Sequence, residues 1–228
     1  MPLFEDFINI LFPQTCAGCN NALITGEKYI CTDCLYQLPR TFFWKETDNP
    51  VARLFWGRVY LENASSFFYF HKKSRLQNIL HHLKYKNQKE IGFELGKMFG
   101  AELRDTPYSS ADAIVPVPLH KSKLNKRGYN QSELIALGIS EILDIPVNTE
   151  ALKRVIASES QTRKSRFERW ENVEKIFSLN DPDFFKDKHV LLVDDVLTTG
   201  ATLEACASAI LEVPNSKVSA VTIANAVI

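Results

Sequence analysis

The segment from His189 to Thr202 constrains the fold of this chain more than any other. It reads His-Val-Leu-Leu-Val-Asp-Asp-Val-Leu-Thr-Thr-Gly-Ala-Thr. The apolar run His189–Val193 predicts a strand that is buried on both faces. Apolar residues at helical spacing from Thr202 onward predict a helix. A strand, a short loop and a helix in this order are typical of the βα units that build parallel sheets.

The loop between this strand and helix suits a ribose 5-phosphate. Free N–H groups and the positive end of the helix dipole can bind a phosphate, and Gly200 lets the backbone approach it. Asp194 and Asp195 can accept hydrogen bonds from sugar hydroxyls. Since side chains alternate along a strand, both can serve one ribose only where the strand turns into the loop, and we expect them there. An acidic strand end followed by a Thr/Gly helix cap is the structural alternative; the complete motif favours binding.

The same loop excludes two other nucleotide sites. It lacks the Gly-Lys-Thr ending of a Walker A loop, and it contains no G-x-G-x-x-G sequence. The ATPase and dinucleotide-binding classes are therefore not supported.

The chain as a whole has the character of a soluble globular protein. Of its 228 residues, 45% are hydrophobic and 24% charged, and 27 Lys+Arg balance 27 Asp+Glu. Any attraction to nucleic acid must then be local. The N-terminus makes a poor signal peptide and no apolar run is long enough for a bilayer, so we expect a cytoplasmic protein without membrane insertion.

Four of the five cysteines form two Cys-x-x-Cys pairs, Cys16/Cys19 and Cys31/Cys34, with eleven residues between the pairs. In a reducing compartment this spacing predicts a tetrahedral zinc with four thiolates. Four cysteines leave no open position, so the zinc would be structural. A thioredoxin-like redox pair, the alternative, would need a single Cys-x-x-Cys beside a βαβ unit. The fifth, Cys206, is expected to be a small core residue.

The remaining pattern predicts an α/β domain. From about residue 110 strands and helices alternate, which implies a doubly wound, mostly parallel sheet. We assign residues 1–45 to the zinc module and 46–228 to this domain. The expected elements are a hairpin of 59–61 with 67–70, helices beginning at Leu76 and Ile91, strands at 113–118 and 218–224, a helix at 132–143, and edge strands near 145–147 and 155–156.

Two basic segments flank the predicted crevice. Leu119–Gln131 follows the 113–118 strand, so it faces the same edge of the sheet as Asp194. Ser160–Val173 has the length and position of a lid over that edge. A solvated charged stretch is the alternative for each; their positions favour function.

Taken together, these features resemble the ComF family, the competence-associated branch of type I phosphoribosyltransferases. The resemblance rests on the cysteine pairs, Val115–His120 with Arg127–Gln131, Gln161-Thr162 with 169–173, and the loop 193–202. The last three also resemble the synthase half of glutamine PRPP amidotransferase. That enzyme's glutaminase half is missing here, so the resemblance does not imply its glutamine activity.

The resemblance implies a role for each site residue. Asp194 and Asp195 are the catalytic pair that binds ribose hydroxyls, and Mg²⁺ accompanies the ligand phosphoribosyl pyrophosphate (PRPP). The complete PRPP loop is Asp194, Asp195, Val196, Leu197, Thr198, Thr199, Gly200, Ala201 and Thr202. The pyrophosphate and hood residues are Pro118, Leu119, His120, Lys126, Arg127, Arg163, Lys164, Arg166 and Arg169. The metal ligands are Cys16, Cys19, Cys31 and Cys34.

Three functions remain open at this point. The first is support of DNA uptake in competence, through single-stranded DNA and competence-machinery proteins, with transfer of phosphoribosyl to an unknown acceptor. Arg127 with Tyr129, Arg166 with Phe167 and Arg169 with Trp170 would contact single strands. The second is a metabolic phosphoribosyltransferase acting on a nucleobase or amine. The third makes the zinc module a docking platform, with Trp44 and Trp56 as anchors.

Overall fold

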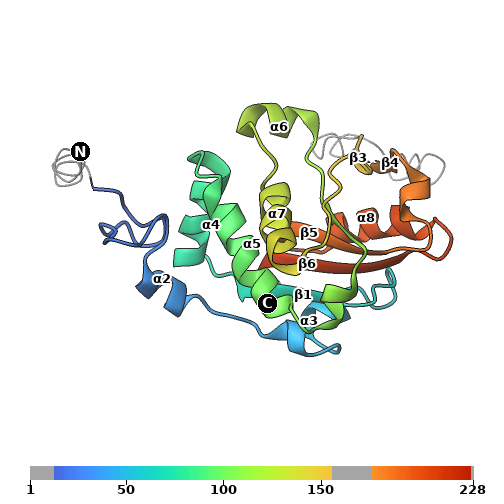
Figure 1. Cartoon of the computed structure of the whole chain (residues 1–228), viewed down its shortest axis with the longest axis horizontal. Coiled ribbons are helices and arrows are strands. Elements are labelled where there is room, and N and C mark those ends of the chain that lie inside the picture. Colours follow the sequence, from blue (N-terminus) through green and yellow to red (C-terminus); the bar gives the residue numbers. More distant parts are fainter. Residues whose placement is uncertain (1–12, 156–175, 227–228) are drawn as a thin grey trace, which may run out of the picture.

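A four-stranded parallel sheet lies at the centre of the computed structural model, which describes residues 13–155 and 176–226 (Figure 1). Its strands in spatial order are β1 (Ala64–Tyr69), β6 (Lys217–Asn225), β5 (His189–Leu197) and β2 (Ala113–Pro116). All three pairings are parallel. A second sheet pairs β3 (Leu152–Arg154) with β4 (Phe177–Leu179) in antiparallel fashion. The predicted α/β fold with a mostly parallel sheet is confirmed.

Helices cover both faces of the main sheet. The helices α4 (Arg75–Tyr85), α5 (Glu90–Leu103) and α7 (Gln131–Leu143) share one apolar cluster with Leu191 and Val193 of β5. Helix α8 (Ala201–Leu211) shares a second cluster with Val190 and Leu192. Successive side chains of one strand thus enter two cores, which explains why the strand reads as a continuous apolar run. The described residues also form three short α-helices, α2 (Thr32–Gln37), α3 (Pro50–Arg53) and α6 (Lys121–Arg127), and three 3-10 helices, η1 (Phe43–Lys45), η2 (Pro107–Ser110) and η4 (Pro182–Phe185).

Two glycines set the distance between α5 and α7. A Cβ on Gly96 would lie 2.2 Å from the carbonyl oxygen of Ile135, and one on Gly138 would lie 2.1 Å from that of Phe93. Since real Cβ atoms do not approach carbonyl oxygens so closely, the two helix backbones meet where both residues lack a side chain. This close crossing sets how near the middle of α7 lies to α5.

The predicted hairpin of 59–61 with 67–70 is wrong. Strand β1 pairs in parallel with β6, and residues 59–61 form no strand. Phe67 and Phe68 are both fully buried, so this aromatic segment belongs inside the molecule rather than in a half-exposed hairpin. The outer edge of β1 is covered by Pro39–Thr41, through an antiparallel bridge between Arg40 and Phe68.

The first part of the chain packs against the sheet domain. Trp44 is only 2% exposed and lies edge-on to Phe67 and Phe99, so it is a core residue and the idea that it anchors a partner is wrong. Trp56, in contrast, is 62% exposed. Cys16 and Cys34 belong to the same apolar cluster as α4 and α5. The domain boundary between residues 45 and 46 stays a prediction.

Candidate PRPP site and four-cysteine cluster

The loop after β5 forms the start of helix α8. Gly200 caps the helix with φ of 77°, in the left-handed region that favours glycine. A Cβ there would also lie 3.0 Å from both the Leu54 and Phe55 side chains, so any other residue at this position would be crowded as well as strained. Thr198 and Thr199 are exposed beside it, and the Oγ1 of Thr199 accepts a hydrogen bond from the N–H of Ala201 at 3.4 Å. The predicted loop and helix start are therefore present, with exposed hydroxyls where a phosphate would lie.

Arg58 braces this loop from a distant segment. Its Nη1 donates to the carbonyl oxygens of Thr199, at 3.0 Å, and Leu54, at 3.2 Å. Its Nη2 pairs with Glu204 in the first turn of α8. The guanidinium therefore ties the loop and helix to the turn before β1. Arg58 is not among the site residues predicted from the sequence, because no motif surrounds it there.

The two carboxylates lie inside strand β5 rather than after it. The strand runs on to Leu197, because its pairing with β6 continues to Leu197 and Asn225; the expectation that it ends at Val193 is wrong. Ser132 at the start of α7 donates to Asp194 Oδ1 at 2.9 Å, and Lys84 in α4 pairs with Asp195 Oδ2 at 2.7 Å. Although they are neighbours on one strand, both carboxylates are contacted from the α4–α7 layer.

Asp194 and Asp195 bring two carboxylates of like charge close together. Burial, and then the charge of Asp195, raise the pKa of Asp194 to about 7. The backbone N–H of Asp195, at 2.8 Å, and the Ser132 hydroxyl oppose this shift by donating to the carboxylate. Asp194 therefore keeps its proton to a higher pH than an ordinary aspartate does, a behaviour typical of functional sites.

The predicted pyrophosphate segment starts at the same edge of the sheet. Strand β2 lies beside β5, and the N–H of Val117 donates to the carbonyl oxygen of Val193 at 2.9 Å. The turn Pro118–His120 follows and leads into α6, where the His120 ring accepts from the N–H of Ser122 at 3.2 Å. Topology thus brings the turn and the acidic pair to one edge of the sheet.

The basic residues after this turn differ in their surroundings. Lys126 is exposed, whereas Arg127 lies over the Tyr85 ring and donates to Gln131 at 2.7 Å. Tyr129 is 8% exposed and its hydroxyl donates to the carbonyl oxygen of Leu83, so the expectation that it stacks on a base is wrong. The hood residues Arg163, Lys164, Arg166 and Arg169 lie outside the described residues, as do Gln161, Thr162, Phe167 and Trp170.

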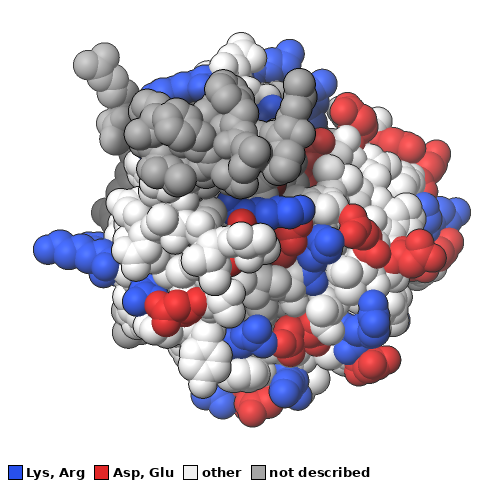
Figure 2. Space-filling model, turned by 60° about the vertical axis from the view of Figure 1, so that its left-hand side comes forward, with Lys and Arg blue, Asp and Glu red and all other residues white. Residues whose placement is uncertain are grey.

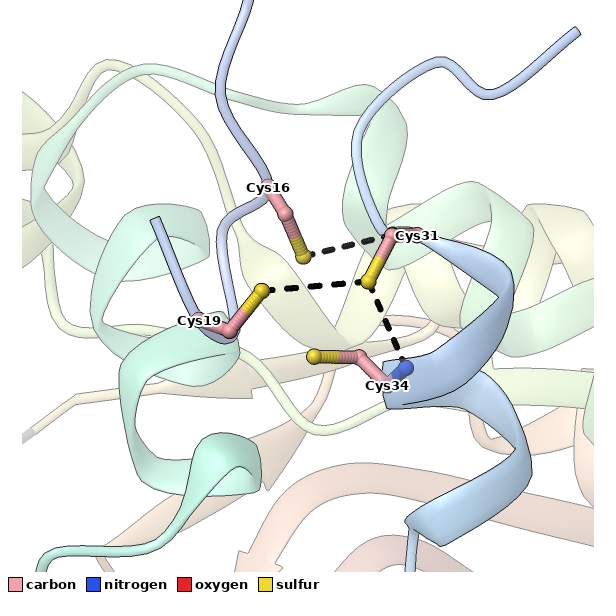
Figure 3. A group of neighbouring side chains, drawn as sticks. All are labelled: Cys16, Cys19, Cys31 and Cys34. Carbon is pink, nitrogen blue, oxygen red and sulfur yellow. Dashed lines mark hydrogen bonds between the residues drawn. The ribbon is translucent and has the colours of Figure 1, made fainter. Parts of the chain in front are cut away.

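The four cysteine sulfurs converge on one point (Figure 3). All four Sγ atoms lie within 4.8 Å of one another, and those of Cys19 and Cys31 are 3.8 Å apart. Zinc with bonds of about 2.3 Å in tetrahedral geometry holds its sulfurs about 3.8 Å apart, so the donor set fits such an ion. Burial raises the pKa of Cys16, but the N–H groups of Cys31, Cys19 and Gly18 outweigh it and lower the pKa to about 7. Such donors favour the thiolates that a metal requires.

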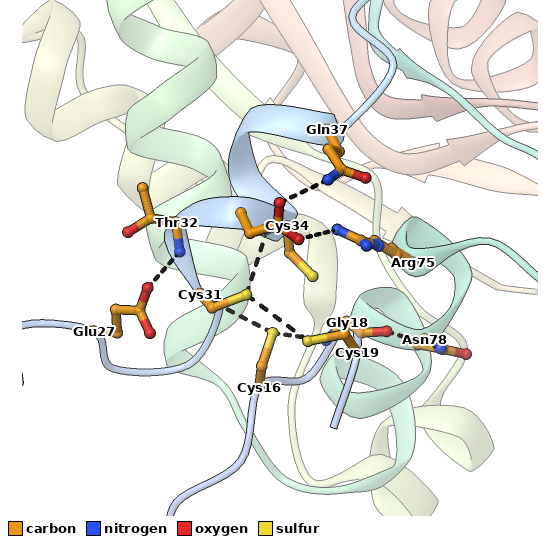
Figure 4. Close-up of polar contacts among 11 residues, drawn as sticks. Cys16, Gly18, Cys19, Glu27, Cys31, Thr32, Cys34, Gln37, Arg75 and Asn78 are labelled. Atoms are coloured by element: carbon orange, nitrogen blue, oxygen red, sulfur yellow. Dashed lines mark hydrogen bonds and ion pairs between the residues drawn. The ribbon is translucent and has the colours of Figure 1, made fainter. Parts of the chain in front are cut away.

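Helix α4 holds this cluster against the domain (Figure 4). Arg75 pairs with Asp33 at 2.7 Å, and the Asn78 amide donates to the carbonyl oxygen of Gly18 at 3.0 Å. Glu27 closes the turn between the two cysteine pairs by accepting from the N–H of Thr32 at 2.7 Å. The cluster can therefore bind a metal such as zinc in a fixed position relative to α4.

Charges of both signs are interspersed on the face of the molecule in Figure 2, in keeping with the zero net charge. No helix within the described ranges is long and apolar enough to cross a membrane. Cys206 is fully buried in the second apolar cluster, which confirms that it is a core residue.

Comparison with known proteins defines the class. A phosphoribosyl transferase domain family matches residues 131–226. Together with the parallel sheet, this match identifies a protein with a phosphoribosyltransferase domain, and such a domain implies a ligand of the PRPP type. The Lys84 and Pro118–His120 segments lie outside the matched region.

The relatives define the family more closely. Competence protein F of Haemophilus influenzae is 35% identical over 56% of this chain and 58% of its own. DNA utilization protein YhgH of Escherichia coli is 33% identical over 60% and 61%, and competence protein ComFC of Bacillus subtilis is 28% identical over 87% and 78%. The chain belongs to the ComF/YhgH family. Its match spans about three fifths of the first two relatives.

Solved structures with a similar fold include glutamine PRPP amidotransferase from B. subtilis in complex with ADP and GMP. It shares 19% identity with a TM-score of 0.44, over 62% of this chain and 30% of that one.

Proposed function

We propose that this protein binds PRPP at the carboxyl edge of its parallel sheet and supports the handling of DNA in competence. One observation carries the proposal: the acidic pair of β5 leads directly into a glycine-capped helix start with exposed threonine hydroxyls. Carboxylates for a ribose and a phosphate cradle within one loop are what a ribose 5-phosphate needs.

Each part of the ligand has its own residues in this proposal. Asp194 and Asp195 accept hydrogen bonds from the ribose hydroxyls, and Thr198–Thr202 binds the 5-phosphate. Pro118–His120, with Lys126 and Arg127, lies on the pyrophosphate side. The resemblance to the family adds Arg163, Lys164, Arg166 and Arg169, which lie outside the described residues, as expected contacts of the pyrophosphate. Arg58 keeps the phosphate loop in place through its contacts with Thr199 and Glu204.

If the site turns over PRPP, the reaction is displacement at C1 of the ribose. The bond from C1 to the pyrophosphate oxygen breaks with its electron pair on the pyrophosphate, and a lone pair of the acceptor forms the new bond. Mg²⁺, if bound together with the ligand, would neutralise part of the pyrophosphate charge. The carboxylates of Asp194 and Asp195 orient the ribose and favour the positive charge that develops at its ring. The acceptor is a nucleobase, an amine or another nucleophile.

Zinc at Cys16, Cys19, Cys31 and Cys34 is the proposed structural metal. The closed set of four sulfurs and the fit of their spacing support it. A reducing, cytoplasmic location is part of this proposal, because thiolates must stay unoxidised to hold the ion.

The names of the relatives favour a role with DNA, and the surface offers a candidate contact. A groove of about 470 Å³ is lined by residues from the stretch Thr47 to Ala64, including Trp56 and Arg58. Tyr60, which also lines it, is 70% exposed. Exposed aromatic rings of this kind suit stacking against the bases of a single strand. Competence-machinery proteins are the other proposed partners. The alternative, a metabolic phosphoribosyltransferase without a DNA role, rests on the phosphoribosyl transferase match alone.

Calorimetric titration with PRPP and Mg²⁺ tests the proposed site. The double variant Asp194→Asn/Asp195→Asn should lose binding that the wild type shows. Asp48→Asn is the matched control, since the Asp48 carboxylate forms an exposed ion pair with Arg53 and is not one of the proposed ligand contacts. Equal affinity of the double variant and the wild type would refute the site.

Two further measurements separate the candidate roles. Release of pyrophosphate from PRPP, measured with a set of nucleobases and small amines, identifies an acceptor if the protein is a metabolic enzyme. Binding of a fluorescent single-stranded oligonucleotide should weaken as salt increases if the protein contacts DNA. Pyrophosphate release without any oligonucleotide binding would favour the metabolic alternative.

A further inference from the structure

Lys84 is a cation of the site that the proposed roles do not use. It lies in the last turn of α4, and its Nζ is 2.7 Å from Asp195 Oδ2. The side chains of Lys84 and Asp195 are only 21% and 15% exposed. Burying two charges costs much of their hydration energy. The presence of this ion pair is therefore weak evidence that Lys84 serves only to stabilise the fold.

The partner of Lys84 is a group that the ligand itself needs. Under the proposed function Asp195 accepts hydrogen bonds from the ribose, yet one of its oxygens is already bound to the ammonium. If a ribose hydroxyl takes this oxygen, the partly buried ammonium is left with the charge of Asp194, which already interacts with it, and has room for a stronger anionic partner. PRPP brings one, because its pyrophosphate is attached to C1, next to the carbon that carries the 2-hydroxyl.

Hydrogen bonds hold the part of α4 around Lys84 in place. The carbonyl oxygen of Leu83 accepts from the Tyr129 hydroxyl, and Asn78 ties α4 to Gly18. Tyr129 follows the proposed pyrophosphate turn and α6 in the chain, so Lys84 is anchored beside the segment that leads from that turn. A lysine has a four-carbon flexible stem and a compact charge, so the ammonium can move between two anions while the helix stays in place.

We propose that Lys84 is a binding residue for the pyrophosphate of PRPP, and that it pairs with Asp195 only while the site is free of ligand. The inference rests on the proposed PRPP site. It adds a residue from α4, outside the region that matches the phosphoribosyl transferase family. In the bound state the ammonium neutralises the leaving group, and Asp195 is free to hold the ribose.

The test compares two ligands, PRPP and ribose 5-phosphate, by calorimetry in the presence of Mg²⁺. Lys84→Met should weaken PRPP by about 10- to 100-fold, as expected for one lost hydrogen bond to a charged group. The same variant should bind ribose 5-phosphate as well as the wild type or more tightly, since this ligand has no pyrophosphate and Asp195 is released. Lys84→Arg, which keeps the charge, should retain more PRPP affinity than Lys84→Met.

Matched variants keep the result unambiguous. Lys97→Met removes another helical lysine that pairs with a carboxylate, Glu141 at 3.2 Å, and should change neither affinity. Thermal unfolding checks that Lys84→Met is folded. Equal weakening of both ligands by Lys84→Met, or no weakening of PRPP, would overturn the role of Lys84 and leave the proposed PRPP site intact. A wild type that binds neither ligand would instead overturn the proposed function, and this inference with it.

Discussion

The replacement Asp194→Asn should stabilise the protein at alkaline pH. Asparagine keeps a carbonyl oxygen where Asp194 Oδ1 accepts from Ser132 and from the N–H of Asp195, so both hydrogen bonds can persist. The substitution removes a negative charge that burial and the neighbouring Asp195 destabilise. Burial and Asp195 raise the pKa of Asp194 from 3.8 to about 7, so the folded protein holds this proton more tightly than the unfolded chain does.

This difference in pKa sets the direction and the size of the pH dependence of stability. The stabilising contribution of the protonated Asp194 is complete below the unfolded pKa, near pH 4, and is lost as the pH rises through about 7. At 1.36 kcal/mol for each pKa unit, ionisation costs the wild type roughly 2 kcal/mol at pH 5 and about 4 kcal/mol at pH 8. The variant avoids both costs. The difference in the free energy of unfolding between variant and wild type should therefore grow by about 2–3 kcal/mol from pH 5 to pH 8.

Thermal unfolding of both proteins at pH 5 and pH 8 measures this effect. For a chain of this size the difference in Tm between variant and wild type should increase by about 5–10 °C from pH 5 to pH 8. Asp48→Asn, in an exposed ion pair, is the control and should show no such increase. A difference in Tm that is the same at both pH values, or that shrinks at pH 8, would refute the account of Asp194. PRPP affinity should meanwhile fall, because the variant has lost an anionic acceptor.

Three other changes probe the fold, the phosphate loop and the metal. Gly138→Ala places a Cβ 2.1 Å from the carbonyl oxygen of Phe93, so overpacking should lower the free energy of unfolding by about 1–3 kcal/mol or more. Urea unfolding measures this change. A change below about 0.5 kcal/mol would mean that α5 and α7 can separate freely. Arg58→Met should weaken ribose 5-phosphate several-fold by loosening the Thr199 loop, and unaltered affinity would show that the loop needs no brace. Purified protein should contain about one zinc per chain, and a chelator should lower its Tm by several degrees; a metal-free protein with the same Tm would rule out a structural ion at Cys16–Cys34.

Much of the fold could be predicted because its signals are local. The apolar runs at 189–193 and 218–224 identified strands, and helical spacing identified α4, α5 and α7, since periodicity along the chain reports burial directly. The prediction failed at β1, where the aromatic segment 67–70 was taken for one arm of a hairpin. Whether an apolar strand pairs with its neighbour in sequence or with a strand 156 residues away depends on the arrangement of the whole sheet, as the contact of Ser66 with Thr222 illustrates.

The candidate site likewise has residues that the sequence predicted and residues that it did not. By itself the sequence determined the acidic pair, the threonine and glycine loop and the four cysteines, because the groups of each set lie close together in the chain and their spacing carries the chemistry. Only the tertiary structure brought Ser132 to Asp194 across 62 residues, Arg58 to Thr199 across 141, and Lys84 to Asp195. The contacts of Ser132 and Lys84 depend on how α4 and α7 pack on the sheet, whereas the contact of Arg58 depends on the turn before β1 lying beside the loop after β5. Distances set by packing leave no periodic or local trace in the sequence.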